Sequence, residues 1–235
     1  MPSYVMPIIF FSATAAIAAL SSIVLATTKQ LGASAYRHIG VLVLLVLLAW
    51  FAVATGLSLQ GTYVASPNGL PTIQFGIIGP IVLGLLAYRW LPKLRQVLTA
   101  IPQPWLIGVQ VYRAGGALFV VLWGMGLLPG EFAGPAGYGD LLVGVLAPLV
   151  AWLWASNHAG RRIAALWWNA LGLVDLALAL TLGFVTTPSR FQLLAQDHSS
   201  LLVTQFPLVF IPTFIVPLSI LLHLASLAKL RAEPT

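Results

Sequence analysis

Residues 38–59, "HIGVLVLLVLLAWFAVATGLSL", form the stretch that decides the fold of this chain. They contain no aspartate, glutamate, lysine or arginine, and most of them are leucine, valine or alanine. A bilayer core of ~30 Å is crossed by a helix of roughly 20 apolar residues. The stretch therefore has the length and the composition of a membrane span.

The whole chain shares this character. Of its 235 residues, 60% are hydrophobic and 7% are charged, and the mean hydropathy is +0.98. A soluble domain carries about a quarter charged residues, so water is not the main solvent of this protein. We predict an all-α integral membrane protein, a seven-transmembrane helix bundle that forms a single membrane domain over 1–235. The expected helices are 5–27, 38–59, 71–91, 105–128, 137–155, 162–186 and 205–229.

The charges alternate between successive loops. The formal charge of +6 does not indicate nucleic-acid binding, because the basic residues are scattered through short loops beside apolar segments. Four of these regions are basic: the loops 28–37, 89–104 and 156–162 and the C-terminal tail. The N-terminus and the loop 60–70 have no charge, and the loops 129–136 and 187–204 have little net charge. The positive-inside rule then predicts an external N-terminus and a cytoplasmic C-terminus, in a bacterial inner membrane.

One arginine lies inside a predicted span. The stretch "VQVYRAGGALF", 109–119, surrounds Arg113 with apolar or small residues. An ionisable group at membrane depth costs at least ~2.5–3.5 kcal/mol, so it usually faces a partner or a wet cavity. A partner for Arg113 must therefore come from a polar residue at a similar depth on another span.

Helix geometry selects those residues. At a rise of 1.5 Å per residue, Arg113 lies roughly 12 Å from the cytoplasmic end of its span, Asn169 and His223 roughly 9 Å, and Asp175 roughly 18 Å. Side chains lean toward their helix N-terminus, which brings Asp175 down and His223 up toward Arg113. We expect Asp175 to neutralise Arg113, with Asn169 in support. Gln110 lies one turn earlier on the face of Arg113.

Three interpretations of Arg113 stay open at this point. Its side chain could extend to the cytoplasmic headgroups, as long basic side chains do near helix ends. It could form a structural bridge to Asp175 that holds two spans together. It could also belong to a polar pocket that serves binding or transport, which is the interpretation that we favour.

Helix breakers and a second acidic residue add to this pattern. Pro207, Pro212 and Pro217 recur in the last span, and each removes a backbone donor, which predicts a kinked helix that faces the protein interior. Asp140, in "GPAGYGDLLVG", falls in the first turn of the expected helix 137–155, so we interpret it as a capping residue. A proton relay from Asp140 to Asp175 is the alternative, but their estimated depths differ by several ångströms.

The sequence lacks the residues and motifs that most specific chemistries require. The chain has no cysteine, and it contains neither a metal-hydrolase motif such as H-E-x-x-H nor a phosphate loop. His38 lies at the end of its span, which disfavours haem ligation with His223. No lysine lies within a span to form a retinal Schiff base, since Lys229 ends the last one. We therefore expect no cofactor, no metal and no nucleic-acid partner, and an enzymatic role is uncertain.

The functional hypothesis follows from these residues. We expect a membrane binding or transport protein with a polar site between the spans 105–128, 162–186 and 205–229. Its ligand would be small and anionic or carboxylate-bearing, and the site residues would be Arg113, Asp175, Asn169, His223, Gln110 and Tyr112. The alternative is a non-catalytic membrane subunit or assembly factor, followed by an enzyme that acts on lipid or quinone. Besides membrane lipids, the expected partners are a second copy of the chain or another subunit.

Overall fold

The computed structural model describes residues 2–32 and 34–232, and within these ranges the chain is helical and contains no strand. Seven helical stretches in the described residues are long and apolar enough to cross a membrane. The elements are α1 (Val5–Gln30), α2 (Ser34–Leu59), α3 (Ile73–Trp90), α4 (Pro92–Ala100), α5 (Gln103–Gly108), η1 (Val109–Gly116), α6 (Ala117–Gly124), α7 (Gly130–Ala155), α8 (Arg161–Thr186), η2 (Leu201–Thr204), η3 (Ile211–Ile215) and α9 (Val216–Ala232).

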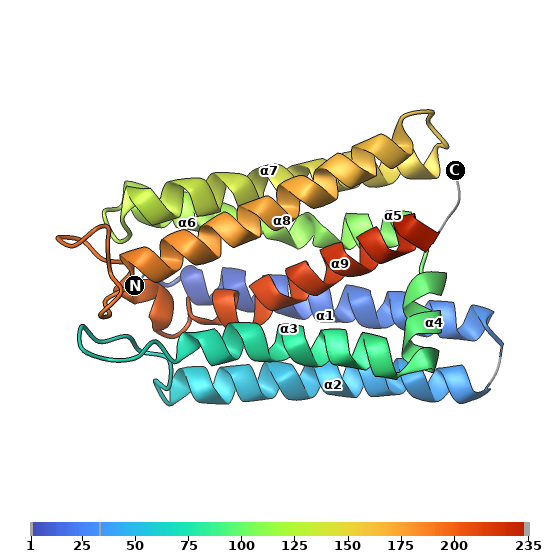
Figure 1. Ribbon diagram of the computed structural model, residues 1–235, viewed down its shortest axis with the longest axis horizontal. Coiled ribbons are helices and arrows are strands. Elements are labelled where there is room, and N and C mark those ends of the chain that lie inside the picture. The colour runs from blue at the N-terminus through green and yellow to red at the C-terminus, as the bar shows by residue number, and fades with distance from the viewer. Residues whose placement is uncertain (1, 33, 233–235) are drawn as a thin grey trace.

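The long helices run side by side along the long axis of the molecule (Figure 1). The stretch α5–η1–α6 forms one continuous span, and η3–α9 forms the last one. α7 packs against α8 and against α5–η1–α6, whereas α9 contacts α8, α3 and α5 and lies in the middle of the bundle. α4 is short and lies across one end, beside α2 and α3 (Figure 1). The last span is thus enclosed by the others.

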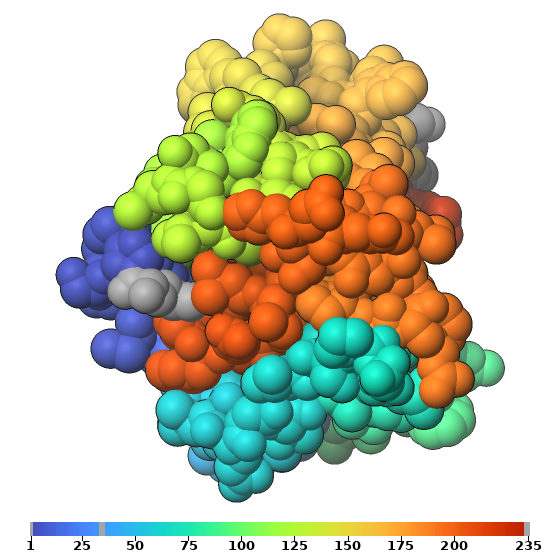
Figure 2. All heavy atoms as spheres, turned by 90° about the vertical axis from the view of Figure 1, so that its left-hand side faces the viewer, coloured from blue at the N-terminus to red at the C-terminus, as the bar shows by residue number. Residues whose placement is uncertain are grey.

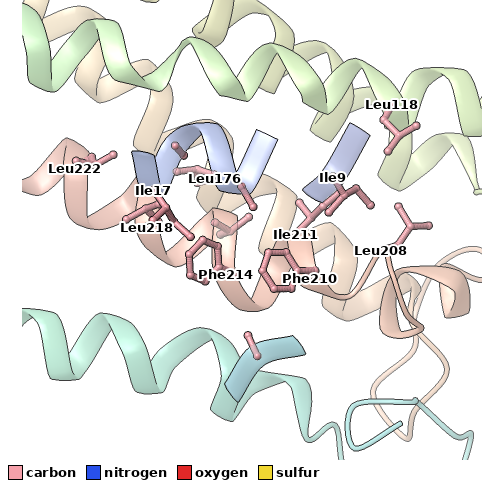
Figure 3. Packing of buried hydrophobic residues seen from close by; sticks show 14 of the residues in the cluster. Ile9, Ile17, Leu118, Leu176, Leu208, Phe210, Ile211, Phe214, Leu218 and Leu222 are labelled. Carbon is pink, nitrogen blue, oxygen red and sulfur yellow. The ribbon is translucent and has the colours of Figure 1, made fainter. Parts of the chain in front are cut away.

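The core lies along that central span (Figure 3). Phe210 and Phe214 are fully buried and stack on each other, with ring centroids 5.0 Å apart. Ile9 and Ile17 of α1 face the same cluster, and Leu218 continues it along α9. Many large apolar side chains on the outside of the spans are exposed, among them Phe11, Phe75, Trp167 and Val174. This distribution suits helices that are surrounded by lipid.

One proline break in the last helical stretch, at Pro217, is compensated by a side chain of another helix. Pro217 has no N–H, so the carbonyl of Thr213, four residues earlier, loses its helical donor. Trp50 of α2 supplies the replacement, because its indole Nε1 donates to the Thr213 carbonyl over 3.3 Å. The backbone forms a π-helix at this point, Ile211–Ile215, before α9 begins. This hydrogen bond therefore joins α2 to the central helical stretch.

Several expected helix bounds need correction. α7 begins at Gly130 and not at 137, since the Gly- and Pro-rich "GEFAGPAG" is helical; its Pro135 lies near the start of the helix. The last span begins at Ile211 and not at 205, because Pro207 stands in a turn region stabilised by Val209 N donating to the Gln205 carbonyl. The fourth span ends at Gly124 and not at 128. The other spans differ from their expected bounds by four residues or fewer.

The two ends of the bundle differ in charge. Every lysine and arginine except Arg113 and Arg190 lies in or next to the end formed by α4, the α7–α8 loop and the end of α9. The opposite end is seen in Figure 2, where the segment 187–210 lies between the α6–α7 turn and the α2–α3 loop. We refer to these as the basic end and the N-terminal end.

Candidate functional site

The fourth span tightens at the position of Arg113. Residues Val109–Gly116 form a 3-10 helix, η1, between two α-helical pieces. With three residues per turn, Gln110, Arg113 and Gly116 share one side of η1. The backbone of η1 packs directly against the backbone of α7. The contact is so close that a Cβ added to Gly144 of α7 would overlap the main chain of Ala114 in η1. A 3-10 stretch within a helix is uncommon and often marks a functional hinge or a strained sequence.

Arg113 is buried and bound from three helices. Its exposed fraction is 2%. Nε donates to Oδ1 of Asp140 on α7 over 2.8 Å, and Nη2 donates to Oδ2 of Asp175 on α8. Nη1 contacts Nε2 of His223 on α9 at 2.9 Å. We call Arg113, Asp140 and Asp175 the charge cluster; with His223 it ties η1, α7, α8 and α9 together.

Glycines provide the space for this cluster. A Cβ on Gly139 would overlap the carboxyl group of Asp175, and a Cβ on Gly116 would overlap Asp140. A Cβ on Gly172 would overlap His223 and come within 3.0 Å of Nη1 of Arg113. The sequence therefore places its smallest residue at each point where a charged or imidazole side chain crosses to a neighbouring helix.

A hydrogen-bonded chain leads from the cluster toward the basic end. Nδ1 of His223 contacts Oδ1 of Asn169 at 2.9 Å, and Nδ2 of Asn169 donates to Oγ of Ser226 over 2.9 Å. Nε2 of Gln103 donates to the same Oγ over 2.6 Å. All four side chains are at most 1% exposed. We call His223, Asn169, Ser226 and Gln103 the His223 chain.

The directions of the hydrogen bonds in the His223 chain determine which ring nitrogen of His223 carries the proton. Arg113 has only donors, so Nε2 of His223 must accept. Nδ1 then carries the proton and donates to Asn169, whose amide nitrogen donates in turn to Ser226 and to the carbonyl of Ala165. His223 is therefore a neutral imidazole in this arrangement.

A family model matches residues 70–231 and is described as a domain of unknown function, DUF8737. The chain belongs to the DUF8737 family. The match covers every residue of the charge cluster and of the His223 chain, whereas α1 and α2 lie outside it. Comparison with curated proteins and with solved structures gave no match.

The DUF8737 domain brings together some of the expected site residues. The expected contact between Arg113 and Asp175 is present, and His223 also touches Arg113. Asn169 reaches Arg113 only through His223. The hydroxyl of Tyr112 bonds with Ser219, 2.9 Å away, and Gln110 is fully buried without a hydrogen-bond partner for its amide. Whether these residues bind a ligand stays a prediction.

Asp140 was not among the expected site residues, and its interpretation as a capping residue is wrong. Because α7 begins at Gly130, Asp140 lies ten residues into the helix and at the level of Asp175. At 1.5 Å per residue this is ~15 Å from the helix start, deep enough to reach Arg113. The overlooked signal is that "GEFAGPAG" can begin a membrane helix, since glycine and proline are common in such helices.

A cavity adjoins the cluster on its N-terminal side. It has a volume of about 350 Å³ and lies between α3, the N-terminal half of α7, α8 and η3–α9. Its walls are largely apolar and include Phe119, Phe132, Leu176 and Phe184, and Asp140 is the charged residue among them. A second cavity, of about 20 Å³, lies between Asp140, Arg113 and α1. Asp140 thus borders both spaces, whereas Arg113 borders only the smaller one.

Proposed function

We propose that this chain is a multi-pass membrane protein that binds and transports a small ligand held in the cavity beside Asp140. The observation that supports this most is the combination of a 350 Å³ apolar cavity with a carboxylate from a buried charge cluster. Small-molecule sites of roughly 300–1,000 Å³ are typically lined by apolar side chains with a few placed polar groups. The ligand would therefore have an apolar body and one polar or charged head.

The charge asymmetry of the bundle supports an orientation in the membrane. The basic end carries nearly all the lysines and arginines, whereas the N-terminal end has Arg190 together with Glu131 and Asp197. By the positive-inside rule this asymmetry supports a cytoplasmic basic end and an external N-terminus, and the membrane that we propose is a bacterial inner membrane. The cavity lies nearer the N-terminal end, so a ligand would reach it from outside or from the outer half of the bilayer.

The arrangement favours Asp140 over Arg113 as the group that holds the ligand. All three nitrogens of Arg113 already have a partner, and two of those partners are carboxylates. An anion in the larger cavity would meet Asp140, because Arg113 does not line that cavity. The anionic ligand suggested by the sequence stays a prediction, but the geometry supports it less than a ligand with a hydrogen-bond donor.

The cavity can be tested by filling it. Ala179 of α8 lines the cavity, whereas Ala177 of the same helix is exposed on the outside of the bundle. We expect Ala179→Phe to abolish binding of 1-adamantanol, a compact apolar probe with one hydroxyl, and Ala177→Phe to leave it unchanged. Calorimetric titration of the protein in mild detergent measures both. Equal binding by the two variants would contradict the proposal.

A second candidate function is that of a subunit that packs against another membrane protein. A groove of about 940 Å³ lies between α1, α5–η1 and α7 in the half near the basic end. Small exposed residues line its α1 side, which lets a further helix approach closely: Ala15, Ala19, Ser22 and Ala26. Purification in mild detergent with a stoichiometric partner that is lost in Ala19→Phe would support this function, and purification of the chain alone would argue against it.

A further inference from the structure

The charge cluster contains one cation and two acids. Arg113 comes from η1, Asp140 from α7 and Asp175 from α8. The other titratable groups nearby are His223 of α9 and Tyr112 of η1, whose hydroxyl bonds with Ser219. From α1 and η3, the small cavity beside the cluster is lined only by Ser12 and isoleucines. With both aspartates ionised, the cluster would therefore have a net charge of −1 in a buried setting, which is costly unless another positive charge is present.

His223 does not supply that charge. Its Nε2 accepts from Arg113 and its Nδ1 donates to Asn169, so both ring nitrogens are occupied as a neutral imidazole. A proton added to Nε2 would remove the acceptor of Nη1 and would set two cations against each other. The positive charge that would neutralise the cluster must therefore be added at a carboxyl group.

Asp140 is the carboxyl-bearing residue of the cluster that lines the two cavities. Its side chain is 13% exposed, against 7% for Asp175 and 1% for Arg113. It borders the apolar cavity, and the 20 Å³ space on its other side is large enough for about one water molecule, which needs ≳10–15 Å³. Proton exchange with water does not run along the His223 chain toward the basic end. Two members of that chain, Asn169 and Gln103, are amides, and amides do not act as acids or bases.

We propose that the cluster holds one exchangeable positive charge, a proton on the aspartates when the cavity is empty and the ammonium group of an apolar amine when it is filled. This inference rests on the proposed function and names its ligand class, a monovalent organic cation. When the amine binds, the O–H bond of the aspartic acid breaks, an ammonium N–H···O contact forms, and one proton leaves through the cavity to water. One positive charge enters and one leaves, so the cluster stays neutral overall.

The experiment uses 1-aminoadamantane and its neutral isostere 1-adamantanol. Calorimetric titrations in phosphate and in Tris at neutral pH give the number of protons released, because the two buffers differ in their heat of protonation. We expect release of one proton per amine bound and binding of the amine at least about tenfold tighter than that of the alcohol, as expected for a charge-assisted contact. Asp140→Asn should remove both effects, whereas Glu131→Gln, on the exposed start of α7, should change neither.

The outcomes separate this inference from the proposed function. Equal binding of amine and alcohol without proton release would leave the cavity as a ligand site and overturn the proton exchange. If neither probe binds, the infrared spectrum of the ligand-free protein still tests whether the aspartates hold a proton. A protonated-carboxyl C=O band that disappears in the Asp140→Asn/Asp175→Asn variant would support the proton site while the proposed ligand site fails. The absence of that band would overturn the inference.

Discussion

At the scale of single residues, the stability of the site depends on charge balance. Arg113 is the largest polar side chain in the interior, and its partners come from helices that are far apart in the sequence. A buried ion pair is costly to break from one side, because the remaining charge has neither water nor a partner. Removing all the charges together avoids that cost.

This contrast gives a prediction for Arg113. Arg113→Met should lower the free energy of unfolding by about 3–5 kcal/mol, since it leaves Asp140 and Asp175 facing each other without a cation. The neutral combination Arg113→Met/Asp140→Asn/Asp175→Asn should recover most of that loss. Thermal unfolding in detergent measures both. A single variant as stable as the wild type would show that the cluster does not hold the helices together.

If the neutral combination folds and still binds 1-aminoadamantane as tightly as the wild type, the cluster is a structural bridge only. Loss of the preference for the amine in a folded protein supports the binding role. The same variant thus separates two of the interpretations that the sequence left open for Arg113.

At the scale of elements, contact between η1 and α7 positions Arg113 against Asp140. Gly144 lets the two backbones touch, since a Cβ there would overlap main-chain atoms of Ala114, which cannot move aside as a side chain could. At Gly124, the end of α6, an added Cβ would have no neighbouring atom within 4 Å. The two glycines therefore form a matched pair for testing close packing.

We expect Gly144→Ala to lower the free energy of unfolding by about 1–3 kcal/mol, as overpacking typically does, and to weaken binding at Asp140. Gly124→Ala should leave stability unchanged or raise it by up to about 1 kcal/mol, because alanine favours helix over glycine. Thermal unfolding of both variants beside the wild type provides the comparison. If the two substitutions changed the free energy of unfolding equally, the close contact between η1 and α7 would not be needed for stability.

At the scale of the whole molecule, the orientation in the membrane can be measured directly, because the chain has no cysteine of its own. Ser66 in the α2–α3 loop and Ser156 after α7 are both exposed and lie at opposite ends of the bundle. The experiment uses intact cells that express the protein and whose inner membrane is reachable by reagent from outside. A maleimide that does not cross the membrane should label Ser66→Cys and leave Ser156→Cys unlabelled. The reverse pattern would contradict the orientation given by the basic end.

The sequence alone determined the number of long apolar helices and the identity of the buried cation. Apolar length can be read without reference to neighbouring helices, so the seven helices that are long and apolar enough to cross a membrane could be counted from stretches such as 38–59. Depth along a helix follows from its rise per residue, so Asp175 and His223 could be matched to Arg113. These predictions needed only local geometry.

Only the tertiary structure decided the composition of the site. Asp140 belongs to the cluster because α7 begins at Gly130. The composition of "GEFAGPAG" permits this start, but the packing of Gly130 and Gly137 against α6 is a tertiary contact. Similarly, the bonds of Asn169 with His223 and Ser226 depend on how α8 and α9 are rotated toward each other. Rotation and close approach are properties of helix pairs, so the balance of one arginine against two aspartates was fixed only when the helices packed together.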